Sequence, residues 1–170
     1  FTLPALTAGI QNQGLNNYVP EKNATILQHV ISISANGANT GATFYQTQPF
    51  TVLQDAYAIK FKDYGLYYLS ANQYLFFASV ISKSILKSFE WANKANWERV
   101  KKCYIKLPIQ NHKIDFNFME TIVAELETQR VTKFTAYLKT TGLDNYELTE
   151  EEKKILDDKN KDIIFKPFKL

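Results

Sequence analysis

The sequence predicts an α+β fold, in which a small mixed, β-rich domain with packed helices is followed by a long protruding α-helix. Residues 1–62 consist of short apolar runs separated by polar, glycine-containing segments, the texture of strands joined by loops. Two later stretches, residues 66–87 and 115–139, repeat apolar side chains every three or four residues, which is typical of amphipathic helices. The chain is 45% hydrophobic over 170 residues, enough for one domain with a core.

Several strands are expected in the amino-terminal part of the chain. Residues 7–20 carry five amide side chains and two glycines, so they are expected to form an exposed loop and turn. Residues 27–34 alternate apolar and polar side chains as a half-buried strand does, and residues 36–41, NGANTG, predict a turn into a second strand. Residues 51–62 alternate again and predict one further strand, where the carboxylate of Asp55 needs a partner or solvent.

Helices dominate the rest of the chain. Residues 66–87 lack glycine and proline and predict an amphipathic helix. Residues 104–107 predict a short strand, and residues 109–114 a connector near which the domain boundary is expected. Residues 115–139 form the clearest helix, and residues 148–161 predict a short acidic helix with a capping-box-like start.

The long helix has recognisable ends and an apolar stripe. Asp115 or Asn117 can cap its start, and Gly142 lies just past its end. We expect the stripe to pair antiparallel with a second such helix, although it can also pack on its own domain, since a stripe does not identify its partner. The stripe consists of Met119, Ile122, Val123, Leu126, Phe134 and Leu138.

Residues 89–108, FEWANKANWERVKKCYIKLP, concentrate positive charge, aromatic rings and amides. The whole chain has a net charge of +3, but residues 1–110 carry ten Lys and Arg against five Asp and Glu. Basic side chains attract phosphate, and Asn amides offer the donor and acceptor pairs that distinguish base edges. The segment therefore predicts docking on an anion such as DNA, with a solvated helix face as the alternative. Trp91 and Trp97 are expected to pack this segment onto the domain rather than to stack on bases.

The sequence offers no pattern typical of catalysis or of metal binding. No carboxylate or cysteine stands at ligand spacing near His29 or His112, so no metal is expected. No phosphate-binding glycine loop occurs, and no nucleotide cofactor is expected. Cys103 is expected to be a packed residue in a reducing compartment, and no apolar run is long enough to span a bilayer. The chain is therefore expected to be cytoplasmic and not an enzyme.

Four segments follow one another in a recognisable order, namely LPALTAGIQNQGLNNYV, SISANGANTGATFYQTQPFTVLQDAYAI, FEWANKANWERVKKCYIKLPI and IDFNFMETIVAELE. This order resembles half of a specificity subunit of type I restriction-modification systems, or the related specificity region of single-chain type IIG enzymes. The resemblance implies a target recognition domain at 1–112 that lacks its N-terminal lead segment, then a conserved spacer and dimerisation helix at 113–142. Residues 143–170 are then a short helix and a linker into a following repeat, with IIFKPFKL as its first strand.

The role implied by the resemblance is recognition of double-stranded DNA without catalysis. One half reads one part of a bipartite target, and the expected partners are a methyltransferase (modification) subunit or domain and a second specificity half that pairs through the helix. Polar side chains on exposed loops are the expected base or phosphate contacts: Gln11, Asn12, Gln13, Asn16, Asn17, Asn36, Asn39 and Thr40. The basic segment adds Lys87, Asn93, Lys94, Asn96 and Lys101.

Two other functions remain open on the sequence. The first is a protein-interaction module that uses the long helix and carries an incidental basic patch. The second is an enzyme with an unrecognised site, which would need a deep pocket with convergent carboxylates.

Overall fold

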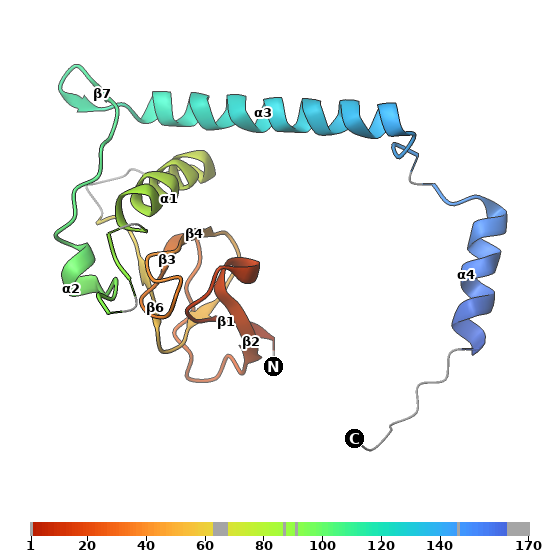
Figure 1. The fold of residues 1–170 in the computed structure, drawn as a ribbon, viewed down its shortest axis with the longest axis horizontal. Coiled ribbons are helices and arrows are strands. Elements are labelled where there is room, and N and C mark those ends of the chain that lie inside the picture. Colours follow the sequence, from red (N-terminus) through yellow and green to blue (C-terminus); the bar gives the residue numbers. More distant parts are fainter. Residues whose placement is uncertain (1, 63–67, 87, 91, 146, 163–170) are drawn as a thin grey trace. The chain divides into compact units, whose positions relative to one another are not determined.

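Figure 1 shows the fold of the chain in a computed structural model. The structure describes residues 2–62, 68–86, 88–90, 92–145 and 147–162, of which 158–162 are described by their backbone alone. The predicted first strand of a following repeat, residues 163–170, lies outside the described residues. The chain divides into two compact units, Phe1–Leu126 and Glu127–Leu170. The α+β fold class is confirmed, with strands and helices in the first unit and helices in the second.

The first sheet has the order β2-β1-β5. Strand β1, Leu3–Leu6, pairs antiparallel with β2, Leu15–Val19, and parallel with β5, Thr51–Val52. The short 3-10 helix η1, Gln11–Gly14, joins β1 to β2. The prediction of a loop over residues 7–20 is therefore wrong for its second half, because backbone pairing with β1 makes LNNYV a strand despite its two asparagines.

The second sheet has the order β4-β3-β6, with β3, Val30–Ser34, at its centre. The predicted hairpin is confirmed, since β3 pairs antiparallel with β4, Thr43–Gln46, across the turn at residues 36–41. All five residues of β3 are buried, so the expected half-buried strand is wrong. The cause is that Ile31 and Ile33 belong to the main apolar core whereas Val30 belongs to a smaller one, which leaves neither face open.

The single strand predicted for residues 51–62 is two strands. Strand β5 ends at Val52, and β6, Ala56–Ile59, pairs with β3 in the other sheet. Asp55 adopts the left-handed conformation between them, with φ 75°. Its carboxylate oxygen Oδ1 accepts a hydrogen bond from Nδ2 of Asn36 at 2.8 Å, which supplies the expected partner.

Helix α1, Ala71–Ile85, covers the β4-β3-β6 sheet (Figure 1). The predicted helix is confirmed over this range, but its predicted start is wrong, because residues 68–70 are not helical and Ser70 is the cap. Leu66, Tyr67 and Lys87 lie outside the described residues. Ser70 and Gln73 form a capping box at its start, which satisfies backbone N–H groups that have no partner within the helix. Its buried face packs with β3 and β4 to form the main core, through Phe77, Ala78, Ile81 and Ile85.

The segment after α1 differs from its prediction. Residues 104–107 are not a strand, because their backbone pairs with no other strand. The alternation in the sequence has another cause: Ile105 and Leu107 pack on the core, whereas Tyr104 and Lys106 are exposed. The predicted connector instead forms a hairpin of β7, Ile109–Gln110, and β8, Lys113–Ile114. Its turn residues Asn111 and His112 have φ values of 50° and 61°, the left-handed values that a tight hairpin turn needs.

Helix α3, Phe116–Thr141, confirms the predicted long helix. Oδ1 of Asp115 accepts a hydrogen bond from the N–H of Phe118 at 2.8 Å, so Asp115 is the cap. Gly142, with φ 69°, ends the helix, and the N–H of Leu143 donates to the carbonyl oxygen of Leu138 at 2.9 Å.

Helix α4, Glu150–Asp162, confirms the second predicted helix. The N–H of Thr149 donates to Oε2 of Glu152 at 2.8 Å, and the N–H of Glu152 donates back to Oγ1 of Thr149 at 3.3 Å. This reciprocal pair is the predicted capping box.

Candidate nucleic-acid interface

The loop between β1 and β2 carries exposed amide side chains, and a backbone hydrogen bond joins its two ends. Its ends are joined by a hydrogen bond from the N–H of Thr7 to the carbonyl oxygen of Gly14, at 3.0 Å. Inside it, Asn12 and Gln13 have left-handed φ values of 46° and 56°, which are uncommon for residues other than glycine. Gln11, Asn12 and Gln13 are all exposed. The loop therefore presents three neighbouring amides to solvent.

Gly14 is required at the end of this loop. Its φ is +89°, and a Cβ atom there would lie 2.9 Å from the carbonyl oxygen of Thr7. That oxygen belongs to the residue whose N–H closes the loop, so a side chain at position 14 would disturb the closure directly.

Two hollows flank the loop and collect amides from separate parts of the sequence. One, of about 410 Å³, is lined by Gln11 together with Asn16 of β2 and Asn39 of the β3–β4 turn. The other, of about 290 Å³, is lined by Asn12 and Gln13 together with Gln46 and Gln48. The structure thus brings five of the predicted contacts, and two glutamines that the sequence reasoning missed, around η1. Asn17 is also exposed, on β2.

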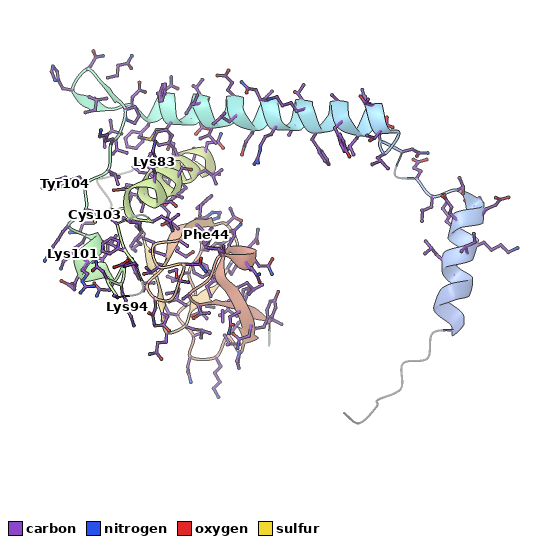
Figure 2. All side chains as sticks on the ribbon, viewed as in Figure 1. Phe44, Lys83, Lys94, Lys101, Cys103 and Tyr104 are labelled. Carbon is purple, nitrogen blue, oxygen red and sulfur yellow. The ribbon has the colours of Figure 1, made fainter. Side chains whose placement is uncertain are left out.

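Lys83 is the basic residue that the structure places beside this loop. It lines a third hollow, of about 410 Å³, together with Gln13, Phe44, Ser79 and Ser82. Lys83 is exposed and has no ion-pair partner within the described part of the chain (Figure 2). The sequence could have indicated that Lys83 is exposed beside Ser79 and Ser82, because the three residues recur at helical spacing on the polar face of a predicted amphipathic helix.

Two predicted contacts on the β3–β4 turn have structural partners. Thr40 is only 2% exposed, and its Oγ1 accepts a hydrogen bond from the N–H of Ala95 at 2.9 Å. The expectation that Thr40 lies on an exposed loop is therefore wrong, because it ties the basic segment to the turn. Asn36 is half-buried and uses its Nδ2 on Asp55. Asn39, in the same turn, lines the hollow that also contains Gln11 and Asn16.

The basic segment contributes no residue to these three hollows. Its Tyr104 and Lys106 line a further hollow together with Lys83. Asn93, Lys94, Asn96 and Lys101 are exposed, whereas Lys87 and Trp91 lie outside the described residues. Nζ of Lys101 pairs with Oε2 of Glu98 at 2.5 Å.

Helix α2, Trp97–Val100, gives the basic segment its local structure. Oδ1 of Asn96 caps it by accepting a hydrogen bond from the N–H of Arg99 at 3.1 Å. Trp97 packs edge-on against Tyr57, with ring centroids 6.3 Å apart, although 48% of Trp97 remains exposed. Burial, and next the electrostatic effect of the nearby Cys103, raise the pKa of Tyr57. The Tyr57 hydroxyl donates to the carbonyl oxygen of Ala95 at 3.0 Å.

The chemistry of the three hollows suits a polyanion with hydrogen-bonding edges. Their lining residues include amides, hydroxyls and a lysine, and none of these described residues is an Asp or Glu that would repel phosphate. The described residues also contain no cluster of His, Cys, Asp and Glu able to hold a metal ion.

The type I restriction modification DNA specificity domain matches residues 2–136 of the chain. The chain belongs to this family. The match spans the two three-stranded sheets, α1, α2 and most of α3, so it includes every segment that contributes to the hollows around η1. Members of this family are DNA-recognition modules of restriction-modification systems and are not themselves catalytic. No curated protein and no solved structure matches the chain. Among the described helices of this specificity domain, none has the length and apolar character needed to cross a membrane.

Proposed function

We propose that the chain reads one half of a bipartite double-stranded DNA target and thereby directs methyltransferase and nuclease modules to it. It does so in the cytoplasm, as half of a type I specificity subunit or as the specificity region of a single-chain enzyme. The observation that carries this proposal is the gathering of amides from three separate segments around η1. Gln11, Asn16 and Asn39 line one hollow although they lie on the β1–β2 loop, on β2 and on the β3–β4 turn.

The amides are suited to read bases and the lysine to contact phosphate. An Asn or Gln amide presents a donor and an acceptor side by side and matches the edge of adenine in the major groove. Lys83 carries a full charge without directional preference, which suits a phosphate contact that sets register. Because Gln13 lines the hollow that holds Lys83 and also the hollow that holds Asn12, a duplex on this face meets both kinds of group together.

In this proposal the basic segment contacts the phosphate backbone of the DNA at a second place on the domain. Lys94 is exposed and, like Lys102 and Lys106, has no ion pair within the described residues. Lys101 must first leave Glu98, and Asn96 already uses its side-chain oxygen as a cap, so both are expected to contribute less than Lys94. Asn93 is exposed beside Lys94 and completes this set.

The test is a titration of the chain with duplex DNA at several salt concentrations. We expect the logarithm of the binding constant to fall linearly with the logarithm of salt concentration, and each lysine that contacts a phosphate contributes a slope of about −0.9. Lys83→Ala and Lys94→Ala should each make the slope shallower by about that amount. Lys153→Ala, on the exposed acidic helix α4, is the matched control and should leave the slope unchanged. Absence of binding to any duplex at low salt would refute the proposal.

Helix α3 is proposed to pair with the corresponding helix of a second specificity half. Beyond the first compact unit, Val131, Phe134 and Tyr137 are 65%, 62% and 58% exposed, so this part of the helix carries large apolar side chains without cover in the single chain. Leu126 and the half-buried Leu138 belong to the same set of pairing residues. Ile122 and Val123 are half-buried within the first unit and can contribute only at the start of such a pair.

Met119 is withdrawn from the predicted pairing set. It is fully buried in the main core of the first unit, so it anchors the helix to its own domain. Pairing of the exposed part is tested by sedimentation: Phe134→Lys should abolish self-association and leave DNA binding by a single half intact. If the same substitution abolished DNA binding alone, the helix would instead belong to the DNA contact.

The exposed face of α3 also favours a second candidate function, a protein-interaction module with an incidental basic patch. The two proposals differ in one result. A module of that kind keeps its partner when Lys83 and Lys94 are both replaced by Glu, whereas DNA recognition is lost.

A further inference from the structure

We infer that Gln46 is a positioning residue that holds the DNA-reading loop in its binding conformation. The inference rests on the proposed function and deepens it, because it names the contact that connects the reading loop to the rigid core. No pattern in the sequence distinguishes Gln46 from Thr47 and Gln48, the two polar residues that follow it.

The side chain of Gln46 spans the two three-stranded sheets. Gln46 is the last residue of β4, in one sheet, and the loop that contains η1 joins two strands of the other. Its Nε2 donates one hydrogen bond to the carbonyl oxygen of Gln13, at 3.3 Å, and another to Oγ of Ser32, at 2.9 Å. Ser32 lies on the central strand β3 and is 4% exposed. Both N–H groups of the Gln46 amide are therefore used, one on the loop and one on the core.

The loop needs such a support because its conformation is not the one its residues prefer. Asn12 and Gln13 both adopt left-handed φ values, and glutamine in particular has no local side-chain hydrogen bond that favours this region. The hydrogen bond between Thr7 and Gly14 fixes the ends of the loop but not its middle. Gln46 acts on the middle, at the carbonyl oxygen of one of the two left-handed residues. A loop held in an unfavourable conformation by its surroundings is a common feature of binding sites.

The position of Gln13 matters for both neighbouring hollows. Gln13 lines the hollow with Asn12, Gln46 and Gln48, and also the hollow with Lys83. If its backbone moves, the amides of the loop change their distance from the lysine, and a duplex cannot satisfy both at once. The expected consequence is a loss of discrimination between sequences rather than a loss of attraction to DNA, because the charged groups stay in place.

The chemistry at position 46 is restrictive. A glutamate of the same length would place an oxygen against the carbonyl oxygen of Gln13, and a methionine keeps the length and much of the volume but has no donor. Gln46→Met is therefore the informative substitution. The matched control is Gln110→Met on β7, an exposed glutamine in the hairpin that precedes α3.

The experiment uses the whole 170-residue chain and a pool of duplexes with a randomised segment. The unsubstituted chain selects its preferred duplex from the pool, and binding of that duplex is then compared with binding of a scrambled duplex of equal composition. We expect Gln46→Met to reduce the ratio of the two affinities about threefold to tenfold, the usual effect of losing a hydrogen bond of this kind. The dependence of affinity on salt should not change, and Gln110→Met should match the unsubstituted chain.

Hydrogen exchange of backbone amides separates positioning from general support of the fold. In Gln46→Met the N–H of Leu15, which donates to the carbonyl oxygen of Asn12 in the middle of the loop, should exchange faster. The N–H of Ser34, which donates to the carbonyl oxygen of Ala42 within the core hairpin, should be unaffected. Equal acceleration at both amides would mean that Gln46 supports the whole domain, and would overturn the inference.

The two proposals fail in different ways. If the unsubstituted chain shows no preference among duplexes, sequence recognition by this chain fails and the inference falls with it. If the unsubstituted chain discriminates and Gln46→Met discriminates equally well, only the inference is overturned.

Discussion

Replacing Met119 by alanine tests where the recognition domain ends. Met119 lies on α3 only a few residues after Asp115, at the place where sequence patterns alone suggest that a separate spacer helix has begun. In the structure its side chain is 0% exposed and belongs to the same core cluster as Phe77 and Ile85 of α1. If the start of α3 is part of the domain core, the substitution must destabilise the whole domain.

The size of the effect follows from burial. Truncating a fully buried methionine to alanine removes apolar contacts and leaves a cavity, at a cost of about 2–5 kcal/mol in the free energy of unfolding. Leu126→Ala, measured at a protein concentration too low for α3 to pair, is the control, because Leu126 lies on the same helix and is 54% exposed in the single chain. Alanine has the higher helix propensity, so this substitution should change the free energy of unfolding by no more than about 0.5 kcal/mol.

The assay is urea unfolding followed by tryptophan fluorescence, which reports on the first unit because Trp97 packs against Tyr57 there. We expect the unfolding midpoint of Met119→Ala to fall while the slope with urea stays constant. The reasoning would be refuted if Met119→Ala cost less than about 1 kcal/mol, well below the range for a buried methionine. It would be refuted equally if Leu126→Ala cost as much as Met119→Ala, since exposure would then not decide the effect.

Two further predictions concern a glycine and a carboxylate. Gly14→Ala should lower the free energy of unfolding by more than Gly37→Ala does. Both glycines have positive φ, which costs an alanine about 1–2 kcal/mol, but of the two only position 14 places the new Cβ against a backbone oxygen. Equal unfolding midpoints of the two variants would contradict this prediction. Hydrogen bonds from the backbone N–H and then the hydroxyl of Thr149 lower the pKa of Glu152 below its usual 4.5, so the capping box stabilises α4 above that value and is lost as the pH falls through the lowered pKa. Amide chemical shifts across α4 should report this acid transition, and Glu152→Gln should remove its dependence on pH.

The helices were largely predictable from sequence because their ends depend on neighbouring residues. Asp115 caps α3 through an N–H three residues away, and Gly142 ends it with a left-handed backbone. Thr149 and Glu152 form their capping box within a single turn. Such contacts are encoded in short stretches of chain, so the correct residues in the correct spacing suffice.

The strands were harder to predict because each needs a partner distant in sequence. The stretch LNNYV looks like part of a polar loop, yet it is β2 because β1 supplies hydrogen bonds along it. The opposite error occurs at residues 104–107, where alternating side chains pack on the core but no strand lies beside them. Alternation reports which side chains are buried, and pairing of the backbone is a separate condition.

Sequence by itself determined the α+β class, the ends of α3, the capping box of α4, the amide-rich loop and the family, since each depends on composition, local spacing or the order of segments. Tertiary structure decided which polar groups form the candidate interface. It buried Thr40 against Ala95, 55 residues away, and it brought Lys83 and Gln46 to the loop around η1. It also assigned Met119 to the core rather than to a free helix face. The physical reason is that exposure and hydrogen bonding of a side chain are set by the elements that pack around it, which local sequence does not specify.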